Sequence, residues 1–186
     1  MKKLTLIALI VLLLLSVVLL PSCKRQSDEE AYAIACDLLE RSYNLNVAYY
    51  GEGLAYDEDE LVEGSYYHVS MDAPFTRRSD LINETKAVFS ERIASDLVDV
   101  YIDGTASLGV VLYARYITGY DGYLTVRKDY DNILDEVEKY DASTLEIKKN
   151  NRRQIKATVQ NVDKTAEIEV VLVYEVDGWR LDSPTY

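Results

Sequence analysis

Acidic side chains crowd one short stretch of the chain, in the order Asp57, Glu58, Asp59, Glu60 and Glu63. Carboxylate oxygens are ligands that calcium prefers, but calcium loops place them at alternating positions, with a glycine at the turn and a final bidentate acid. Here the first four acids are consecutive, and no glycine lies among the five. We therefore interpret residues 51–65 as a solvated acidic loop that could face a cationic partner, with calcium binding as the alternative.

The chain has one histidine, His68, in the segment SYYHVSM, which is typical of a strand. A single histidine without a second His or Cys beside it does not make a typical zinc site, and no motif places a Ser or Cys nucleophile. Paired carboxylates can hydrolyse glycosidic bonds, but with thirty-two acidic residues such pairs also arise by chance. We expect no catalytic residue, metal or cofactor, and a carboxylate-based enzyme is the alternative.

The stretch LLPSCKRQSDEE, residues 19–30, sets Cys23 between an apolar run and an acidic one. Lys2 and Lys3 precede the apolar run, residues 4–20, in which two residues are polar. A basic start and an apolar core before a small-residue site are typical of a secretory signal. As a helix at ~1.5 Å per residue the run spans roughly 25 Å, less than the ~30 Å of a bilayer's hydrocarbon core. These features predict export from the cytoplasm.

The four residues LPSC, which end at Cys23, resemble the bacterial lipobox, in which an aliphatic residue three places before the cysteine and a small residue directly before it mark cleavage. Pro21 is a less usual choice within that motif. The resemblance implies a thioether from Cys23 to a diacylglycerol and removal of residues 1–22 as a signal peptide, with a short tether at 23–27. Because two or more acyl chains anchor a protein stably, we expect attachment to the outer face of the cell membrane. An uncleaved membrane span and an ordinary secreted protein are the alternatives.

Cys36 is the second cysteine. If Cys23 carries lipid, Cys36 has no partner for a disulfide within the chain, although an extracytoplasmic compartment would permit one. We interpret Cys36 as a small apolar residue on a helix, and a reactive thiol is the alternative.

The chain is acidic, with a formal net charge of −12 at pH 7. Removal of residues 1–22 takes away two of the twenty Lys and Arg residues and none of the Asp and Glu residues, which makes the mature charge about −14. Such a charge argues against nucleic acid as a partner and against adsorption to anionic lipid headgroups. It fits a cationic envelope protein or wall fragment, or simply solubility.

Helical patterns occupy the first part of the mature chain. The S-x-x-E pattern at 27–30 is a capping box. Apolar residues then recur at three- and four-residue spacing over 28–44, which predicts an amphipathic helix. A continuation through LNVAYY, ended by Gly51, is the alternative. Two further helices are predicted over 80–89 and, after an N-cap at Ser90, over 91–101.

Strand patterns dominate the second half. The segment VVLYARYI, residues 110–117, is apolar on both faces, as in a central strand, and a turn leads to a further strand at 123–129. Residues 155–160 and 167–176 alternate apolar and polar side chains, which predicts an antiparallel hairpin with one wet face. The order predicts an α+β fold, with N-terminal helices packed on an antiparallel sheet, in a single domain over residues 28–186.

Three segments carry a resemblance to known proteins: YYGEGLAYDE, VFSERIASDL and GWRLDSPTY. Together with the order of the elements, they resemble the curved-sheet cone of nuclear-transport-factor-like and cystatin-like domains. The longer pattern is similar to small lipoproteins of Firmicutes that are related to inhibitors of cell-wall DL-endopeptidases. The resemblance implies that the antiparallel sheet is curved and formed mainly by the C-terminal half, and that the protein occupies the cleft of a peptidoglycan hydrolase without catalysing a reaction.

Tyrosine is strongly favoured over other aromatic residues, at sixteen against two phenylalanines and one tryptophan. Tyrosine suits half-wet positions, because its ring is apolar and its tip is polar. The candidates for partner contact are the acids at 57–60 and four tyrosines, Tyr113, Tyr116, Tyr120 and Tyr123. Ordinary strand faces and core edges are the alternative places for these rings. We favour a non-catalytic protein-binding module, and the alternative is a domain that binds a small ligand or peptidoglycan fragment in a pocket of the cone-shaped sheet.

Overall fold

The structure is a computed structural model that describes residues 25–104 and 113–186. The helices are α2 (Asp28–Tyr49), α3 (Arg78–Val88) and α4 (Glu91–Tyr101), with a 3-10 turn, η1, at Ala142–Thr144. The strands are β1 (Tyr56–Glu63), β2 (Tyr66–Val69), β3 (Tyr116–Thr118), β4 (Leu124–Arg127), β5 (Glu146–Asn150), β6 (Gln154–Gln160), β7 (Glu167–Glu175) and β8 (Gly178–Leu181).

The predicted α+β class is confirmed, with the helices in the first half and most strands in the second. The predicted signal peptide, Cys23 and the first three residues of the predicted strand at 110–117 lie outside the described residues.

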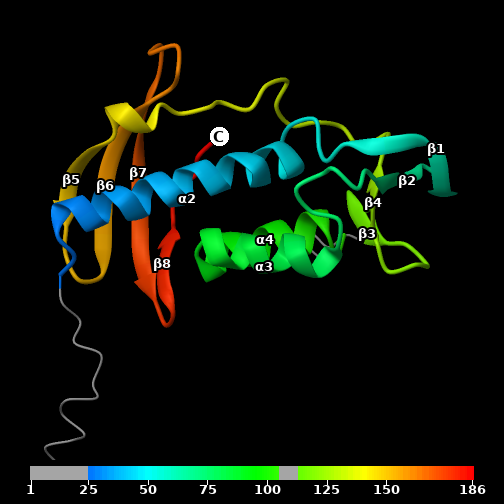
Figure 1. Cartoon of the computed structure of the whole chain (residues 1–186), viewed down its shortest axis with the longest axis horizontal. Helices are drawn as coiled ribbons and strands as arrows, with labels where there is room; N and C mark the ends of the chain where they lie inside the picture. Colours follow the sequence, from blue (N-terminus) through cyan, green and yellow to red (C-terminus); the bar gives the residue numbers. More distant parts are fainter. Residues whose placement is uncertain (1–24, 105–112) are drawn as a thin grey trace, which may run out of the picture.

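The eight described strands form two antiparallel sheets at opposite ends of α2 (Figure 1). The first sheet has the order β1-β2-β4-β3, and the second has the order β5-β6-β7-β8. The expectation of one sheet is therefore replaced by two. Residues 128–145 cross from the first sheet to the second with an isolated bridge between Tyr140 and Asn161 but no named strand, so β4 and β5 do not pair. The predicted hairpin of β6 and β7 is present with continuous antiparallel pairing. The end of the segment 110–117 is β3, an edge strand and not a central one.

Helix α2 begins at the predicted capping box. Glu30 N donates to Ser27 Oγ at 3.1 Å, and Ser27 N donates to Glu30 Oε2 at 2.8 Å. Its 22 residues span about 33 Å at ~1.5 Å per residue, which is enough to reach from the second sheet to the first. The helix continues past 44 and ends at Tyr49, as in the longer of the two expectations, and Leu45 and Tyr49 of this extension are buried in the core. None of the described helices is both long and apolar enough to cross a membrane.

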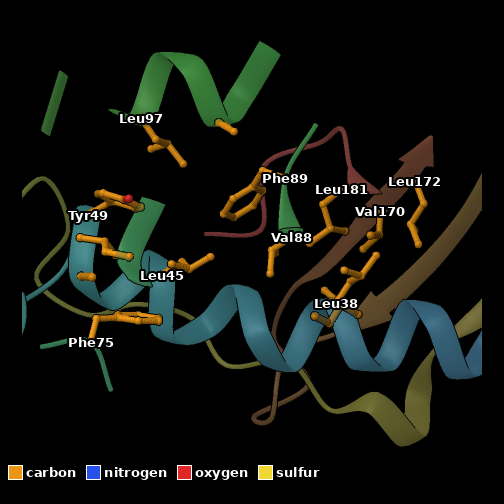
Figure 2. Packing of buried hydrophobic residues seen from close by; sticks show 14 of the residues in the cluster. Leu38, Leu45, Tyr49, Phe75, Val88, Phe89, Leu97, Val170, Leu172 and Leu181 are labelled. Atoms are coloured by element: carbon orange, nitrogen blue, oxygen red, sulfur yellow. The ribbon is translucent and has the colours of Figure 1, made fainter. Parts of the chain in front are cut away.

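One continuous core joins the helices to the second sheet. Figure 2 shows the buried side chain of Leu38 on α2 facing the sheet and that of Leu45 lying further along the helix, toward α3 and α4. The labelled members of the cluster are Leu38, Leu45, Tyr49, Phe75, Val88, Phe89, Leu97, Val170, Leu172 and Leu181. The cluster also contains Leu124 and Val126 of the first sheet, so both sheets share it.

The junction between α3 and α4 is tied to the last strand. Ser90 precedes α4 as predicted, but its side chain does not cap the helix. Its hydroxyl instead donates to Asp182 Oδ1 at 2.6 Å, and its backbone N–H donates to Leu181 O at 2.8 Å. Phe89 also forms a parallel bridge with Leu181. These bonds hold both short helices against the second sheet.

Arg115 connects the C-terminal end of α2 to the first sheet. This side chain is buried, and its Nη1 donates to Tyr49 O at 3.0 Å while its Nη2 donates to Gly51 O at 2.7 Å. Nη2 also donates to Asn132 Oδ1 at 3.0 Å. A cation at the C-terminal end of a helix complements the helix dipole. Gly53 has a φ of +89°, and a Cβ there would lie 2.6 Å from Arg115 Nη2, so the close approach of the arginine requires glycine.

Candidate interaction surface

Strand β1 carries the predicted acidic group, Asp57, Glu58, Asp59 and Glu60, and all four side chains are exposed. The prediction of a loop over 51–65 is wrong for this stretch, because β1 pairs with β2. The strand lies at the edge of the first sheet, where acidic side chains reach water and discourage pairing with another chain. This position explains how so acidic a segment can be a strand.

Two tyrosines and a lysine hold β1 to its sheet. The rings of Tyr56 and Tyr67 lie 5.4 Å apart, and Lys128 Nζ lies 5.7 and 5.5 Å from their centroids. Lys128 Nζ also donates to Glu58 Oε1 at 3.1 Å, and this bond raises the pKa of the lysine. Because both partners are exposed, the pair orients side chains and adds little stability. The sequence analysis missed this group, although Gly64, with a φ of +57°, is a hairpin signal between the two strands.

Two of the predicted tyrosines are the most exposed aromatic side chains of the first sheet. Tyr120 is 93% exposed and Tyr113 is 76% exposed. The guanidinium carbon of Arg127 lies 4.4 Å from the ring centroid of Tyr113, and the same guanidinium donates to both carboxylate oxygens of Asp129 at 2.6 and 3.1 Å. The bidentate pair raises the pKa of Arg127 and lowers that of Asp129. A fixed cation thus supports one face of Tyr113.

One contact links β1 to the turn between β3 and β4, which carries Tyr120 and Tyr123. The hydroxyl of Tyr120 donates to Glu63 Oε2 on β1 at 3.5 Å. Tyr123 is half-buried, and the guanidinium carbon of Arg77 lies 4.8 Å from its ring centroid. We define the first-sheet surface as the exposed residues Asp57, Glu58, Asp59, Glu60, Tyr113 and Tyr120, together with the half-buried Tyr123.

Tyr116, the fourth predicted tyrosine, does not belong to this surface. Its side chain is fully buried, and its hydroxyl donates to Ala48 O at 2.6 Å while accepting from Leu54 N at 3.1 Å. Burial raises the pKa of Tyr116 to about 12. The residue is a core side chain that anchors β3 to the end of α2, so contact with a partner is excluded for it.

His68 and the acids do not gather into a metal-binding group. His68 Nε2 lies 3.7 Å from Asp121 Oδ2 on the turn between β3 and β4. Within the described ranges, no group of three or more His, Cys, Asp or Glu side chains could hold a metal ion.

A cavity of about 290 Å³ lies away from the first-sheet surface, between α2, α4 and the C-terminal segment. Tyr50 lines it, with its ring 4.0 Å from that of Tyr186 and 5.8 Å from that of Tyr101. Burial raises the pKa of both Tyr50 and Tyr101. Asn46 also lines the cavity, and its Nδ2 donates to Thr185 O at 2.7 Å, while its buried Oδ1 has no partner among the described residues. The aromatic lining suits an apolar or aromatic ligand.

A second cavity, of about 380 Å³, lies between α2 and the segment that enters η1. Its lining includes Cys36, Tyr43 and Glu138. Cys36 is half-buried and unpaired on α2, and burial raises the pKa of its thiol, which disfavours the reactive thiolate. The environment agrees with an apolar role for this cysteine.

No protein-family model matches the chain, and no curated protein matches it significantly.

Proposed function

We propose that the mature chain is an extracytoplasmic lipoprotein, anchored through lipid on Cys23, and that its domain binds a cationic envelope protein without catalysing a reaction. The observation that carries this proposal is the first-sheet surface. Tyrosines are enriched among the side chains that dominate protein interfaces, and Tyr113 and Tyr120 are largely exposed. The exposed acids of β1, on the same sheet, would steer a positively charged partner during encounter.

The charges on β1 support a cationic partner. Of its four consecutive acids, Glu58 has an ion pair with Lys128, whereas Asp57, Asp59 and Glu60 have none with any described residue. Three uncompensated carboxylates on one edge strand give a local negative potential, and a partner with complementary charge would associate faster. A basic peptidoglycan hydrolase is the partner class that the sequence resemblance implies, and we propose it as the first to test.

The position of the surface along the molecule is consistent with presentation away from the membrane. Arg25, where the described chain begins, is two positions after Cys23, which allows at most ~7 Å of extended chain. That beginning lies at the second sheet, whereas β1 lies at the far end of α2 (Figure 1). The length of α2 therefore separates the first-sheet surface from the proposed lipid.

Affinity capture from native envelopes tests the proposal. The bait is the mature lipidated protein in detergent, compared with a variant in which β1 is neutralised, Asp57→Asn, Glu58→Gln, Asp59→Asn and Glu60→Gln. A matched control makes the same change of charge at exposed acids elsewhere, Asp135→Asn, Glu136→Gln, Asp163→Asn and Glu167→Gln. We expect the wild type and the control to retain one basic protein, identified by mass spectrometry and then tested in purified form, and the β1 variant to lose it.

If all three baits retained the basic protein equally, the acids of the first-sheet surface would not be part of its binding site. A partner that proves acidic would remove the electrostatic argument.

The cavity beside α4 supports a second candidate, a pocket for a small ligand or peptidoglycan fragment. The observation that favours it is a cavity of about 290 Å³ lined by Tyr50, Tyr101 and Tyr186. Titration of the protein with soluble muropeptides, followed by tyrosine fluorescence, tests it. Binding that is weakened by Tyr186→Ala and unchanged by neutralisation of β1 would favour this candidate, and absence of binding would dismiss it.

A further inference from the structure

The hairpin of β5 and β6 concentrates positive charge in an otherwise acidic chain. Five basic residues fall within nine positions, in the order Lys148, Lys149, Arg152, Arg153 and Lys156. Two of them are paired with acids of the same sheet, Lys148 with Glu146 and Lys156 with Glu169. The other three are the relevant ones, because their charge is available to a partner.

Lys149, Arg152 and Arg153 are exposed and have no acidic partner among the described residues. Lys149 Nζ donates to the neutral side chain of Gln154 at 3.2 Å. The turn itself is fixed, because Asn151 Oδ1 accepts from the backbone N–H groups of Arg153 and Gln154, both at 2.9 Å. The two guanidinium groups are therefore held on a short, ordered turn that projects from the sheet.

This turn lies beside the beginning of the described chain. Asn150 Nδ2 donates to Gln26 O at 2.9 Å and to Asp28 Oδ1 at 2.8 Å. Figure 1 shows the start of the chain leaving the molecule at this end of the second sheet. Gln26 is three positions after Cys23, which allows at most ~10 Å of extended chain. A lipid on Cys23 would therefore place the turn close to the bilayer.

The turn between β7 and β8 lies at the same end of the sheet, because the four strands are antiparallel neighbours in chain order. Val176 at this turn is fully exposed. The acids on either side of it are engaged within the domain, since Asp177 accepts from Arg180 Nη2 at 2.9 Å and Glu175 accepts from the backbone N–H of Glu91 at 3.1 Å. An apolar tip beside exposed cations is a composition that suits the interfacial region of a membrane.

We propose that this end of the second sheet, formed by Lys149, Arg152, Arg153 and Val176, binds the anionic phospholipid headgroups of the membrane in which the protein is anchored. The inference rests on the proposed lipid anchor. The acidity of the whole chain does not oppose it, because charges act through ~8 Å at physiological salt and β1 lies at the far end of α2. Each cation near an anionic membrane surface strengthens attachment, and here the contact also fixes which end of the domain faces the bilayer.

Hydrogen exchange of the lipidated protein tests the proposal. The protein is reconstituted into vesicles of phosphatidylcholine alone or with phosphatidylglycerol, and exchange is followed over residues 149–154. We expect slower exchange on the anionic vesicles, lost at high salt. The variant Arg152→Glu/Arg153→Glu should reduce this protection by about tenfold or more, from the contribution of each cation near the surface.

The matched control is Lys139→Glu/Lys164→Glu, which makes the same change of charge away from this turn, with Lys164 in the turn between β6 and β7. It should keep the protection of residues 149–154. Equal exchange on both vesicles, or equal loss in both variants, would overturn the proposal. So would protection by a soluble polyanion without protection by anionic vesicles. Partition of the protein into detergent is measured first and shows whether the lipid anchor is present. Hydrogen exchange of the anchored protein then shows whether the headgroup contact forms.

Discussion

The two ends of the molecule carry exposed charges of opposite sign. Strand β1 carries four consecutive acids at the edge of the first sheet, and one of them is paired with a cation. The turn between β5 and β6 in the second sheet carries Arg152 and Arg153, both exposed and without an acidic partner in the described chain. Helix α2 joins the two ends.

This difference teaches that net charge is a poor guide to what each surface of a protein can bind. The net charge of −12 describes neither end, because screening confines the effect of each group of charges to its own neighbourhood. A tether beside the basic end would turn the acidic end away from an anionic bilayer, where repulsion is least. The arrangement thus agrees with both proposed contacts at once.

Removal of the proposed lipid site should have the largest effect, because the protein would then no longer be attached to the membrane by either end. We expect Cys23→Ala to leave an uncleaved precursor and to abolish attachment of acyl groups. Detergent partition and mass spectrometry of the purified protein measure both effects. Cys36→Ala is the control and should be processed like the wild type. Normal processing and release of Cys23→Ala would show that the lipoprotein proposal is wrong.

Truncation of Trp179 would show whether the two ends unfold together. This side chain is 8% exposed on β8, and its ring lies 5.4 Å from that of Tyr174. We expect Trp179→Ala to lower the free energy of unfolding by about 3 kcal/mol, at the lower end of the range for aromatic truncations, because the buried Nε1 has no partner in the described chain. Val176→Ala, at an exposed site, should change it by less than ~0.5 kcal/mol.

Urea unfolding followed by circular dichroism measures this loss, and native-state hydrogen exchange shows where it acts. Because one core cluster includes side chains of both sheets, strands of the first sheet should lose protection with those of the second. A loss confined to the second sheet would mean that the two ends are separate cooperative units.

Alkaline pH should weaken the junction of α2 with the first sheet. Burial raises the pKa of Tyr116 to about 12, above the ~10 of an exposed tyrosine, so the folded state favours the neutral phenol. The resulting stability is fully present below pH ~10 and is lost as the pH rises through about 12, which amounts to roughly 2–3 kcal/mol for two pKa units. Urea unfolding between pH 9 and 12 measures the loss, with Tyr116→Phe as the comparison. A free energy of unfolding that declines equally in both proteins would contradict this assignment.

The smallest expected effect concerns the kinetics of the acidic end. Once a partner is in hand, its association rate should fall as salt rises, whereas its dissociation rate should change less. Neutralisation of Asp57, Glu58, Asp59 and Glu60 should lower the association rate by about tenfold at low salt and should flatten the salt dependence. Surface plasmon resonance across a salt series measures both rates. An association rate that is independent of salt would favour the cavity beside α4.

Much of the fold could be predicted because its signals are local. The capping box of Ser27 and Glu30 and the alternation over β6 and β7 specify those elements directly. Strand β1 was missed because acids are depleted in strands, and only its position at a sheet edge makes them tolerable. The division into two sheets depends on pairing between β2 and β4, which are distant in sequence and carry no shared pattern.

The residue types of the candidate site could be predicted from the sequence, but which of the tyrosines are exposed could not. Tyr113 and Tyr116 lie three positions apart in one apolar segment, yet one is exposed and the other is buried. The buried position depends on the carbonyl of Ala48 at the end of α2, which no neighbouring residue indicates. The basic turn was overlooked because the total charge was considered in place of its distribution.

Arg115 has a mechanical consequence. A partner held at β1 and a lipid held at Cys23 would load the chain in series, and the force would pass along α2. At the end of this helix the carbonyls of Tyr49 and Gly51 both accept hydrogen bonds from the same guanidinium, which braces the sheet against rotation about the connecting loop. The helix and first sheet would therefore swing as one lever arm, and a small tilt at the bilayer would become a large sweep at the far end.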